Sequence, residues 1–359
     1  MEIEIGEALK RSDLLFIDVR SPGEYAEASI PGAINIPLFD DREHHQLGTI
    51  FHLLGENEAR HTALMMVSPK LPALIESINE ACGNKLPLLY CRRGGLRSLS
   101  LYHVLNLIGI PALRLKQGYK AFRRYVNEHL SHYQLKSELY ILHGLTGVGK
   151  TAVLKELEKK GFPIIDLEGL ACHRGSVFGA VGLDLFRSQK DFDALLLQQL
   201  DRNSNEPYLV IEGEGSRIGN IHLPAFLSKG MNKGHRILLA ASMKTRVKRI
   251  LSTYITEPLA DNTLIELKEA LSSLRRRMGD QKVDHLTGLL NQGKYASVAE
   301  ILCTDYYDHF YSDSRPECSK FEAVIDATDL ENAAREIIKL IEQPEINSGQ
   351  AVLNTCSLQ

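Results

Sequence analysis

Two short segments combine residue types and spacings that bind phosphate-like anions. The first, Cys91-Arg92-Arg93-Gly94-Gly95-Leu96-Arg97-Ser98, follows the apolar stretch Leu86–Tyr90. A cysteine between a strand and a helix faces backbone N–H groups and the helix N-terminus, which stabilise a thiolate or another anion. The glycines let the backbone curl around that anion, and a buried structural cysteine would need neither them nor the arginines. The segment therefore predicts a catalytic site made of Cys91, Arg92, Arg93 and Arg97.

The second segment is a phosphate-binding loop. Gly144-Leu145-Thr146-Gly147-Val148-Gly149-Lys150-Thr151 matches Gly-x-x-x-x-Gly-Lys-Ser/Thr between an apolar stretch and a helical one. Backbone N–H groups of such a loop converge on phosphate oxygens, the lysine reaches the terminal phosphates and the hydroxyl of Thr151 can ligate Mg²⁺. We expect the phosphates to contact Gly144, Thr146, Gly147, Gly149, Lys150 and Thr151. A nucleotide is the usual ligand, but any pyrophosphate ester presents the same oxygens.

Further polar residues follow two apolar strands of the same half. Glu212 and Glu214 come at the end of the stretch Tyr208–Ile211, where a phosphate-binding loop has its acidic metal partner, so Glu212 is expected to share Mg²⁺ with Thr151. A solvated carboxylate at the strand end is the alternative. Asp166, His173 and Arg174 follow the strand expected at 163–167 and are candidates for the same site, although a single histidine is more often structural.

Both segments need parallel strands that end at one edge of a sheet. Short apolar strands alternate with amphipathic helices throughout, which indicates an α/β fold with parallel sheets. The strands expected are Leu14–Val19, Leu86–Tyr90, Ala112–Leu115, Glu138–His143, Pro163–Leu167, Tyr208–Glu212 and Arg236–Ala240. Residues 261–341 are expected to be mostly helical. The apolar pattern weakens around 131–137, which predicts a linker between domains at 1–130 and 138–342, with a loose tail at 343–359.

Composition excludes several other classes of protein. The chain has 359 residues, 44% of them hydrophobic, with a net charge of −3. It has no apolar run of about 18 residues, as a membrane span would require. Its six cysteines form no Cys-x-x-Cys pair, which argues against a zinc site and a disulfide framework and suits the cytoplasm.

Positive charge is concentrated after the cysteine. The segment from Cys91 to Arg124 contains eight basic residues and no Asp or Glu: Arg92, Arg93, Arg97, Arg114, Lys116, Lys120, Arg123 and Arg124. An anionic partner is expected at this face. Basic residues also recur at Lys244–Arg249 and Arg275–Arg277, where a solvated helix face is the commoner explanation and contact with a nucleic-acid backbone the alternative.

The first third of the chain resembles the rhodanese superfamily. The resemblance rests on 16–25 (FIDVRSPGEY), 30–37 (IPGAINIP), the cysteine loop and Gly118-Tyr119. It implies that Asp18 and Arg20 support the loop. Five residues separate Cys91 from Arg97, whereas simple rhodaneses commonly have four. This longer spacing is that of Cys-x5-Arg phosphatases, so the loop alone leaves both chalcogen transfer and phosphate-ester hydrolysis open.

The order of motifs resembles the bacterial tRNA 2-selenouridine synthase family. The rhodanese-like part and the phosphate loop are followed by 166–179 (DLEGLACHRGSVFG) and 212–224 (EGEGSRIGNIHLP). The resemblance implies conversion of 2-thiouridine at the tRNA wobble position to 2-selenouridine, with selenophosphate as donor. It also implies an S-geranyl-2-thiouridine intermediate made from geranyl diphosphate, no tightly bound cofactor, and an enzyme that supplies selenophosphate as a further partner. Lys116, Lys120, Arg123 and Arg124 would then contact the tRNA backbone.

Three other functions remain compatible with the two loops. A sulfurtransferase fused to a small-molecule kinase would form a Cys91 persulfide from thiosulfate and transfer phosphate with Lys150. A Cys-x5-Arg phosphatase would hydrolyse aryl phosphates, although no clear general-acid aspartate follows the loop. A nucleotide-gated tRNA-binding module would need Lys150 for tRNA binding and would not need Cys91 for modification.

Overall fold

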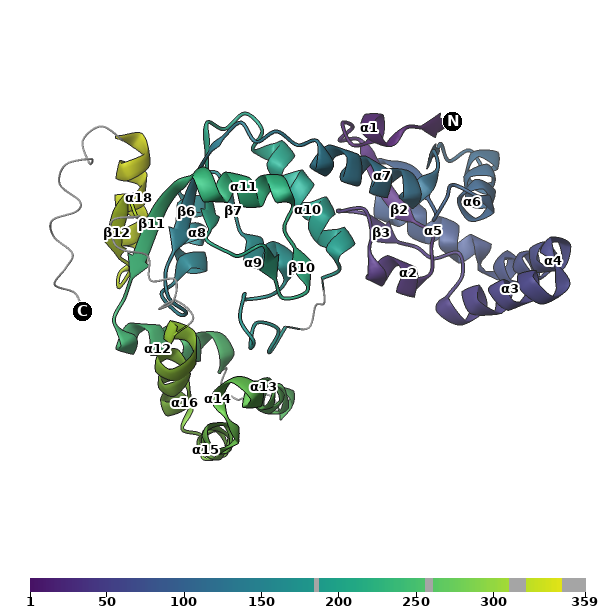
Figure 1. Ribbon diagram of the computed structural model, residues 1–359. Coiled ribbons are helices and arrows are strands. Elements are labelled where there is room, and N and C mark those ends of the chain that lie inside the picture. Colours follow the sequence, from purple (N-terminus) through teal and green to yellow (C-terminus); the bar gives the residue numbers. More distant parts are fainter. Residues whose placement is uncertain (184–186, 256–260, 310–320, 344–359) are drawn as a thin grey trace. The chain divides into compact units, whose positions relative to one another are not determined.

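The computed structural model describes residues 1–183, 187–255, 261–309 and 321–343, which form two compact units (Figure 1). The first unit contains Met1–His132 and Ser188–Gln198, and the second contains the rest of the chain from Tyr133. The expected tail at 343–359 lies outside the described residues except for Gln343. Among the described helices, none combines the length and the apolar character that a membrane span requires.

The first unit is a five-stranded parallel sheet with helices around it. The strand order is β1-β5-β4-β2-β3, for β1 (Glu2–Ile3), β2 (Leu14–Asp18), β3 (Ile34–Asn35), β4 (Leu86–Tyr90) and β5 (Leu113–Leu115). Its helices are α1 (Ile5–Ala8), α2 (Pro22–Glu27), α3 (Asp41–Leu54), α4 (Glu56–Val67), η1 (Ser68–Lys70), α5 (Leu71–Cys82), α6 (Leu96–Leu107) and α7 (Gly118–Ser131). The central strand β4 is almost fully buried, as its continuous apolar sequence requires. It delivers Cys91 to the carboxyl edge of the sheet.

The second unit holds another five-stranded parallel sheet. Its order is β12-β11-β6-β8-β7, for β6 (Glu138–His143), β7 (Ile164–Ile165), β8 (Tyr208–Glu212), β11 (His235–Ala240) and β12 (Ala323–Asp326). After β6 the chain forms β7 and β8 on one side and then β11 and β12 on the other. The loop after β6 therefore lies where the direction of the connections reverses, the usual ligand site of parallel sheets.

Helices of the second unit form two groups. Those that follow or flank the strands are α8 (Lys150–Lys159), α9 (Leu167–Ala171), α11 (Ala225–Lys233) and α18 (Leu330–Glu342), and a small hairpin joins β9 (Arg217–Ile218) to β10 (Ile221–His222). A separate helical group comprises α12 (Met243–Tyr254), α13 (Asp261–Ser273), α14 (Arg275–Met278), α15 (Asp280–Asn291), α16 (Tyr295–Leu302) and the π-helical η2 (Cys303–Tyr307). Figure 1 shows this group gathered away from the sheet, and it has its own apolar core.

Helix α10 (Gln189–Arg202) contributes to both units, because its residues up to Gln198 cluster with the first. Within that unit the N–H of Ser29 donates to Asp191 at 3.2 Å, and Arg123 forms an ion pair with Asp193. A segment that the sequence assigns wholly to the second half therefore supplies part of the first unit.

Two expected elements differ in the structure. The strand expected at 163–167 is confined to Ile164–Ile165, because the Asp166 carboxylate accepts the Gly169 N–H at 2.7 Å and starts α9 at Leu167. The stretch 261–341, expected to be mostly helical, contains strand β12. Its four residues pair with β11, so a partner distant in sequence decides their conformation.

Candidate active site

The Cys91 thiol lies at the base of a turn that leads from β4 into α6. Its Sγ accepts a hydrogen bond from the Gly95 N–H at 3.2 Å and lies 3.2 Å from the Ser98 hydroxyl oxygen. The side chain is only 3% exposed. A thiolate or a terminal chalcogen at this position would therefore meet an amide and a hydroxyl rather than bulk water.

The carbonyl groups of the cysteine loop are tied to neighbouring residues. Cys91 and Arg92 accept hydrogen bonds from the N–H groups of Tyr119 (2.9 Å) and Lys120 (3.0 Å), and Gly94 accepts one from Arg114 (2.5 Å). In a trans peptide, the carbonyl of one residue and the N–H of the next point in opposite directions. The bonds to the carbonyls therefore turn the N–H groups of Arg92, Arg93 and Gly95 the other way, and that of Gly95 indeed reaches Sγ. This arrangement suits an oxyanion.

Gly118 is the position where the loop and α7 approach most closely. Its φ is +58°, and a Cβ there would lie 2.1 Å from the Cys91 carbonyl oxygen and 2.6 Å from the Gly94 nitrogen. Gly109 has a similar positive φ of +84° but open space around its Cβ position. An alanine at either position would cost about 1 kcal/mol of backbone strain. Only the alanine at position 118 would also collide with the cysteine loop.

Gly118→Ala is expected to change the rate at which iodoacetamide alkylates Cys91 severalfold, because the loop must move away from the new methyl group. Gly109→Ala should lower stability by about 1 kcal/mol through backbone strain alone and leave the Cys91 rate as in the native chain. Peptide-resolved mass spectrometry measures the rate, and equal rates in the two variants would contradict this account of Gly118.

A buried ion pair supports the loop from β2. Arg20 Nη2 lies 2.6 Å from Asp18 and donates to the Ala28 carbonyl at 2.7 Å, and both side chains are at most 4% exposed. The Arg20 guanidinium also stacks over the ring of Tyr119, 4.1 Å from its centroid. Because the N–H of Tyr119 holds the Cys91 carbonyl, this pair positions the loop, as the sequence suggests.

The three arginines of the loop have different surroundings. Arg97 forms an ion pair with Glu24 and also donates a hydrogen bond to its second carboxylate oxygen at 3.2 Å. Arg92 and Arg93 are exposed. Burial raises the pKa of Glu24, but the hydrogen bond and charge of Arg97 outweigh this effect and lower it below its ordinary value. Arg97 thus has an acidic partner, while Arg92 and Arg93 have no ion pair within the described residues.

The phosphate-binding loop follows β6 and has its carbonyl groups tied in the same way. They accept hydrogen bonds as follows: Gly144 from Lys150 (3.3 Å), Leu145 from the Val148 N–H (3.1 Å), Thr146 from Arg246 (2.8 Å) and Val148 from Arg249 (2.6 Å). The N–H groups of the residues that follow these carbonyls therefore point the opposite way. Gly147 and Gly149 have φ of +80° and +102°, which glycine adopts readily. The loop is built to receive phosphate oxygens.

Arg246 and Arg249 hold this loop and are not a solvated or nucleic-acid-binding helix face. Arg246 is 3% exposed and pairs with both carboxylate oxygens of Asp308, at 2.7 and 2.9 Å. Arg249 also donates to the Ala327 carbonyl at 2.6 Å. Arg246 and Arg249 are thus held in place by Asp308 and Ala327, which lie far away in the sequence.

Thr151 and Glu212 meet at the carboxyl edge of the sheet. The Thr151 hydroxyl lies 2.6 Å from one carboxylate oxygen of Glu212, and the other accepts the Glu168 N–H at 3.2 Å. Glu168 also lies 3.2 Å from the Thr151 hydroxyl. Glu168 is not among the residues expected from the sequence, although it stands two residues after Asp166, a candidate in the same motif.

Burial raises the pKa values of the three carboxyl groups Glu168, Glu212 and Glu214, and the proximity of their negative charges raises all three further. The charge of Lys150 opposes the shift at Glu168 and Glu214. A carboxylate cluster of this kind favours a cation, and hydroxyl and carboxylate oxygens are the ligands that Mg²⁺ prefers.

No group of three or more His, Cys, Asp or Glu is arranged as a complete metal site in the described part of the chain. Mg²⁺ beside a phosphate loop does not require one, because it is bound by one or two carboxylates together with phosphates and water. Thr151 and Glu212 therefore fit the ion expected from the sequence.

The other expected site residues have structural contacts. Asp166 caps α9, as described above. Arg174 donates to the Val181 carbonyl at 2.7 Å and stacks over Tyr254, and His173 Nδ1 accepts the Gly175 N–H at 3.2 Å. Burial, and secondarily the charge of Arg174, lowers the pKa of His173. These contacts order the loop that follows α9, whereas Glu214 lies with Glu168 near Lys150.

His143, the residue before the phosphate loop, introduces a pH dependence. Burial, then the charges of Arg236 and Lys150, lowers its pKa from 6.5 to about 4. Since Arg236 Nε donates to His143 Nε2 at 3.4 Å, the ring is neutral in the folded state. A histidine whose folded-state pKa is depressed stabilises the fold above pH 6.5, and this contribution is lost as the pH falls toward 4.

We expect the second unit to lose about 1–2 kcal/mol of unfolding free energy between pH 6.5 and 4 through His143. Urea denaturation followed by far-UV circular dichroism measures this loss. His143→Gln should flatten the curve over that range; an unchanged slope in the variant would assign the pH dependence to other groups.

Known protein families match each of the two units. A model of rhodanese-like domains matches residues 4–125, and a model of the tRNA 2-selenouridine synthase AAA domain matches residues 137–339. Among curated proteins, the tRNA 2-selenouridine synthase of Cupriavidus pinatubonensis is 32% identical, over 82% of this chain and 87% of its own. The enzyme of that name from Verminephrobacter eiseniae is 32% identical over 88% of this chain and 93% of its own length. The one from Bordetella bronchiseptica is 31% identical over 86% of this chain and 90% of its own length.

The protein is thus an α/β protein in which a rhodanese-like domain with a buried cysteine precedes a P-loop domain. The chain belongs to the tRNA 2-selenouridine synthase family. The resemblance and the fold class expected from the sequence are confirmed.

Proposed function

We propose that this protein converts 2-thiouridine at the wobble position of tRNA to 2-selenouridine, through an S-geranyl-2-thiouridine intermediate. The observation that carries the proposal is the presence of two separately built anion sites in one chain of this family. The cysteine loop suits a selenophosphate donor, and the P-loop with Thr151 and Glu212 suits a diphosphate. Because each reactant has its own site, the reaction divides into two steps.

In the first step the thiocarbonyl sulfur of the base attacks C1 of geranyl diphosphate. A C–S bond forms, the C1–O bond breaks, diphosphate leaves and N3 of the base releases its proton. The P-loop amides and Lys150 would bind the departing oxygens and stabilise their developing charge. Thr151 and Glu212 would hold Mg²⁺, which when bound neutralises further charge on the leaving group.

In the second step selenium displaces the alkylated sulfur. Alkylation makes C2 of the base more electrophilic and turns the sulfur into a thioether that can leave. The selenium of selenophosphate attacks C2, geranyl thiol departs with a proton, and water then cleaves the Se–P bond to release phosphate. We assign this step to the Cys91 loop, whose amides and exposed Arg92 and Arg93 suit a phosphate-bearing donor.

The basic face after Cys91 would hold the tRNA backbone, but its members are not equivalent. Lys116 pairs with Glu4 at 2.6 Å, Arg123 pairs with Asp193 at 3.2 Å, and Arg124 donates to Gln117 at 2.8 Å. Lys120 is exposed and has no ion pair within the described residues. The residues best placed for phosphates are therefore Lys120, Arg92 and Arg93.

Lys120→Ala is expected to weaken tRNA binding severalfold at low salt and to reduce the slope of log affinity against log salt by about 1. Lys116→Ala is the matched control and should have a smaller effect, because its ammonium group is already paired. Filter binding between 50 and 200 mM salt would show this difference; a larger loss in the Lys116 variant would contradict the assignment.

The direct test supplies the full chain with 2-thiouridine-containing tRNA and geranyl diphosphate, with or without selenophosphate, and identifies the nucleosides by mass spectrometry. S-geranyl-2-thiouridine should form without the selenium donor and 2-selenouridine with it. Absence of both products would exclude the proposed function and favour a kinase-linked sulfurtransferase, for which thiosulfate and ATP are the probes. Hydrolysis of aryl phosphates lost in Cys91→Ser would favour a phosphatase.

A further inference from the structure

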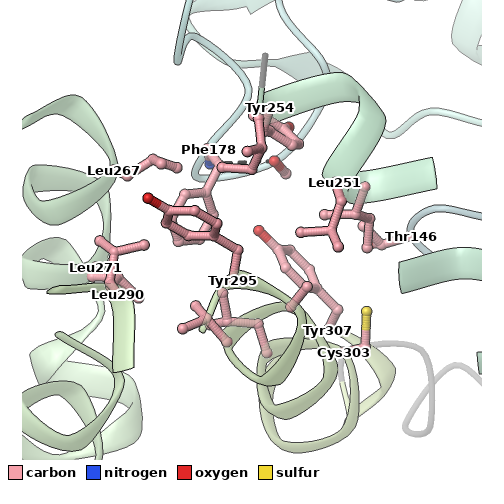
Figure 2. A pocket seen from close by; sticks show the side chains of 16 residues that line it. Thr146, Phe178, Leu251, Tyr254, Leu267, Leu271, Leu290, Tyr295, Cys303 and Tyr307 are labelled. Carbon is pink, nitrogen blue, oxygen red and sulfur yellow. Dashed lines mark hydrogen bonds between the residues drawn. The ribbon is translucent and has the colours of Figure 1, made fainter. Parts of the chain in front are cut away.

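An apolar pocket lies beside the P-loop in the helical group of the second unit. Its walls come from the loop after α9 and from α12, α13, α15, α16 and η2, and Thr146 of the P-loop also lines it. Figure 2 shows Thr146 and Leu251 on one side of this pocket and Leu267, Leu271 and Leu290 on the opposite side, with Tyr295 and Tyr307 between them. The pocket therefore extends from the phosphate loop into the core of the helical group.

Helix α12 forms a wall common to the P-loop and the pocket. Arg246 and Arg249 bind the carbonyl groups of Thr146 and Val148, as described above. One turn further along, Ile250 lines the pocket, and a Cβ on Gly147 would lie 2.9 Å from its Cγ1. Thr146 and Gly147 of the P-loop thus adjoin the apolar side chains of the pocket.

The lining excludes most substituents that a diphosphate could carry. None of the side chains described around the pocket is charged, and Leu271, Leu290 and Cys303 are at most 3% exposed. Its polar groups are few: the Cys303 thiol and the hydroxyl groups of Thr146, Ser176, Tyr254, Tyr295 and Tyr307, of which Ser176 Oγ already accepts the Phe178 N–H at 3.2 Å. A nucleoside would bury its base and ribose here without matching polar partners, at a high cost, whereas a hydrocarbon needs none.

We propose that this pocket binds the hydrocarbon of a diphosphate ester whose phosphates lie in the P-loop, and that Leu271 and Leu290 at its far end limit the chain length. The inference deepens the proposed function and relies on it for the identity of the ester, a prenyl diphosphate. Leu271 belongs to α13 and Leu290 to α15, both in the apolar core of the helical group. The size of two core side chains would thus select the substrate.

Calorimetry on the full chain with inorganic pyrophosphate, ADP and the dimethylallyl (C5), geranyl (C10) and farnesyl (C15) diphosphates tests this assignment. Each buried methylene raises affinity about fourfold, so the C10 ester should bind at least about 100-fold more tightly than pyrophosphate. It should also bind more tightly than ADP. Equal binding of pyrophosphate and the C10 ester, or tighter binding of ADP, would overturn the inference.

Two substitutions at one position test the chain-length limit. Leu290→Phe should reduce the preference for C10 over C5 about tenfold, and Leu290→Ala should improve C15 relative to C10 by a similar factor. Ile265→Ala, on the exposed face of α13, is the control and should change neither ratio. Unchanged pyrophosphate binding shows that each variant is folded. An unchanged order of chain lengths in folded Leu290 variants would overturn the proposal.

A spectroscopic reading covers the case in which a Leu290 variant does not fold. The chain has no tryptophan, so Tyr295→Trp places a single indole in the pocket. Its emission should change with the C10 ester and not with pyrophosphate, and identical responses would overturn the inference. If the chain-length preference in binding changed in the Leu290 variants but the native protein formed no S-alkylated nucleoside, the pocket assignment would stand and the proposed function would be refuted. If the Leu290 variants alkylated tRNA normally and kept the native chain-length preference, the proposed function would stand and the pocket assignment would be refuted.

Discussion

Cys91→Ala should stop the formation of 2-selenouridine and let S-geranyl-2-thiouridine accumulate in the tRNA. The thiol is the group around which the loop is arranged, because its Sγ receives the Gly95 N–H and the loop carbonyls are bound by α7 and Arg114. Alkylation of the base uses the other domain and should continue. We expect the rate of selenium incorporation to fall about 100- to 1,000-fold, as for loss of a group that stabilises charge at the reacting centre.

Cys82→Ala is the matched control, because Cys82 is also buried in the first unit and burial raises the pKa of its thiol. It should reduce selenium incorporation only through any loss of stability. Nucleoside mass spectrometry over a time course measures both products. If Cys91→Ala formed 2-selenouridine at the native rate, Cys91 would have no part in the reaction.

Lys150→Ala should prevent the alkylation step, and with it both products. Lys150 begins α8 beside the P-loop, where its ammonium group lies 3.3 Å from the Gly144 carbonyl and its charge acts on Glu168 and Glu214. Removal of this charge leaves a departing diphosphate with less stabilisation. We expect the alkylation rate to fall about 100- to 1,000-fold.

The control for this variant lies on the same helix. Lys159 is exposed at the last turn of α8 and pairs with Glu156, so Lys159→Ala should alkylate tRNA at the native rate. A further arm supplies tRNA that already carries S-geranyl-2-thiouridine, which Lys150→Ala should convert to 2-selenouridine normally. Failure of that arm would show that Lys150 also serves the second step.

The strands that position both sites could be predicted because their signals are local. Leu86–Tyr90, Glu138–His143 and Tyr208–Glu212 are each built around a run of apolar residues, and the structure gives them the same bounds. Strands buried on both faces have this pattern. Since the carboxyl ends of parallel strands share an edge, the meeting of Thr151 and Glu212 could be expected from the sequence as well.

The contacts that hold the loops could not be predicted, because they join residues distant in sequence. Arg246 binds the carbonyl of Thr146, 100 residues earlier, and Arg97 pairs with Glu24, 73 residues earlier. Neither residue type nor spacing distinguishes a buried arginine of this kind from a solvated one. The apolar pocket could not be predicted for the same reason. Helices α12 to α16 are amphipathic individually, and they enclose a space only when they pack together.

In the proposed reaction, selenium replaces the sulfur of an alkylated base. The most direct measurement gives the full chain purified tRNA that already carries S-geranyl-2-thiouridine, together with selenophosphate and no geranyl diphosphate. We expect 2-selenouridine, with one molecule of geranyl thiol released for each selenium incorporated. The proposed reaction would be excluded if the geranylated tRNA remained unchanged while tRNA with 2-thiouridine was converted under the same conditions.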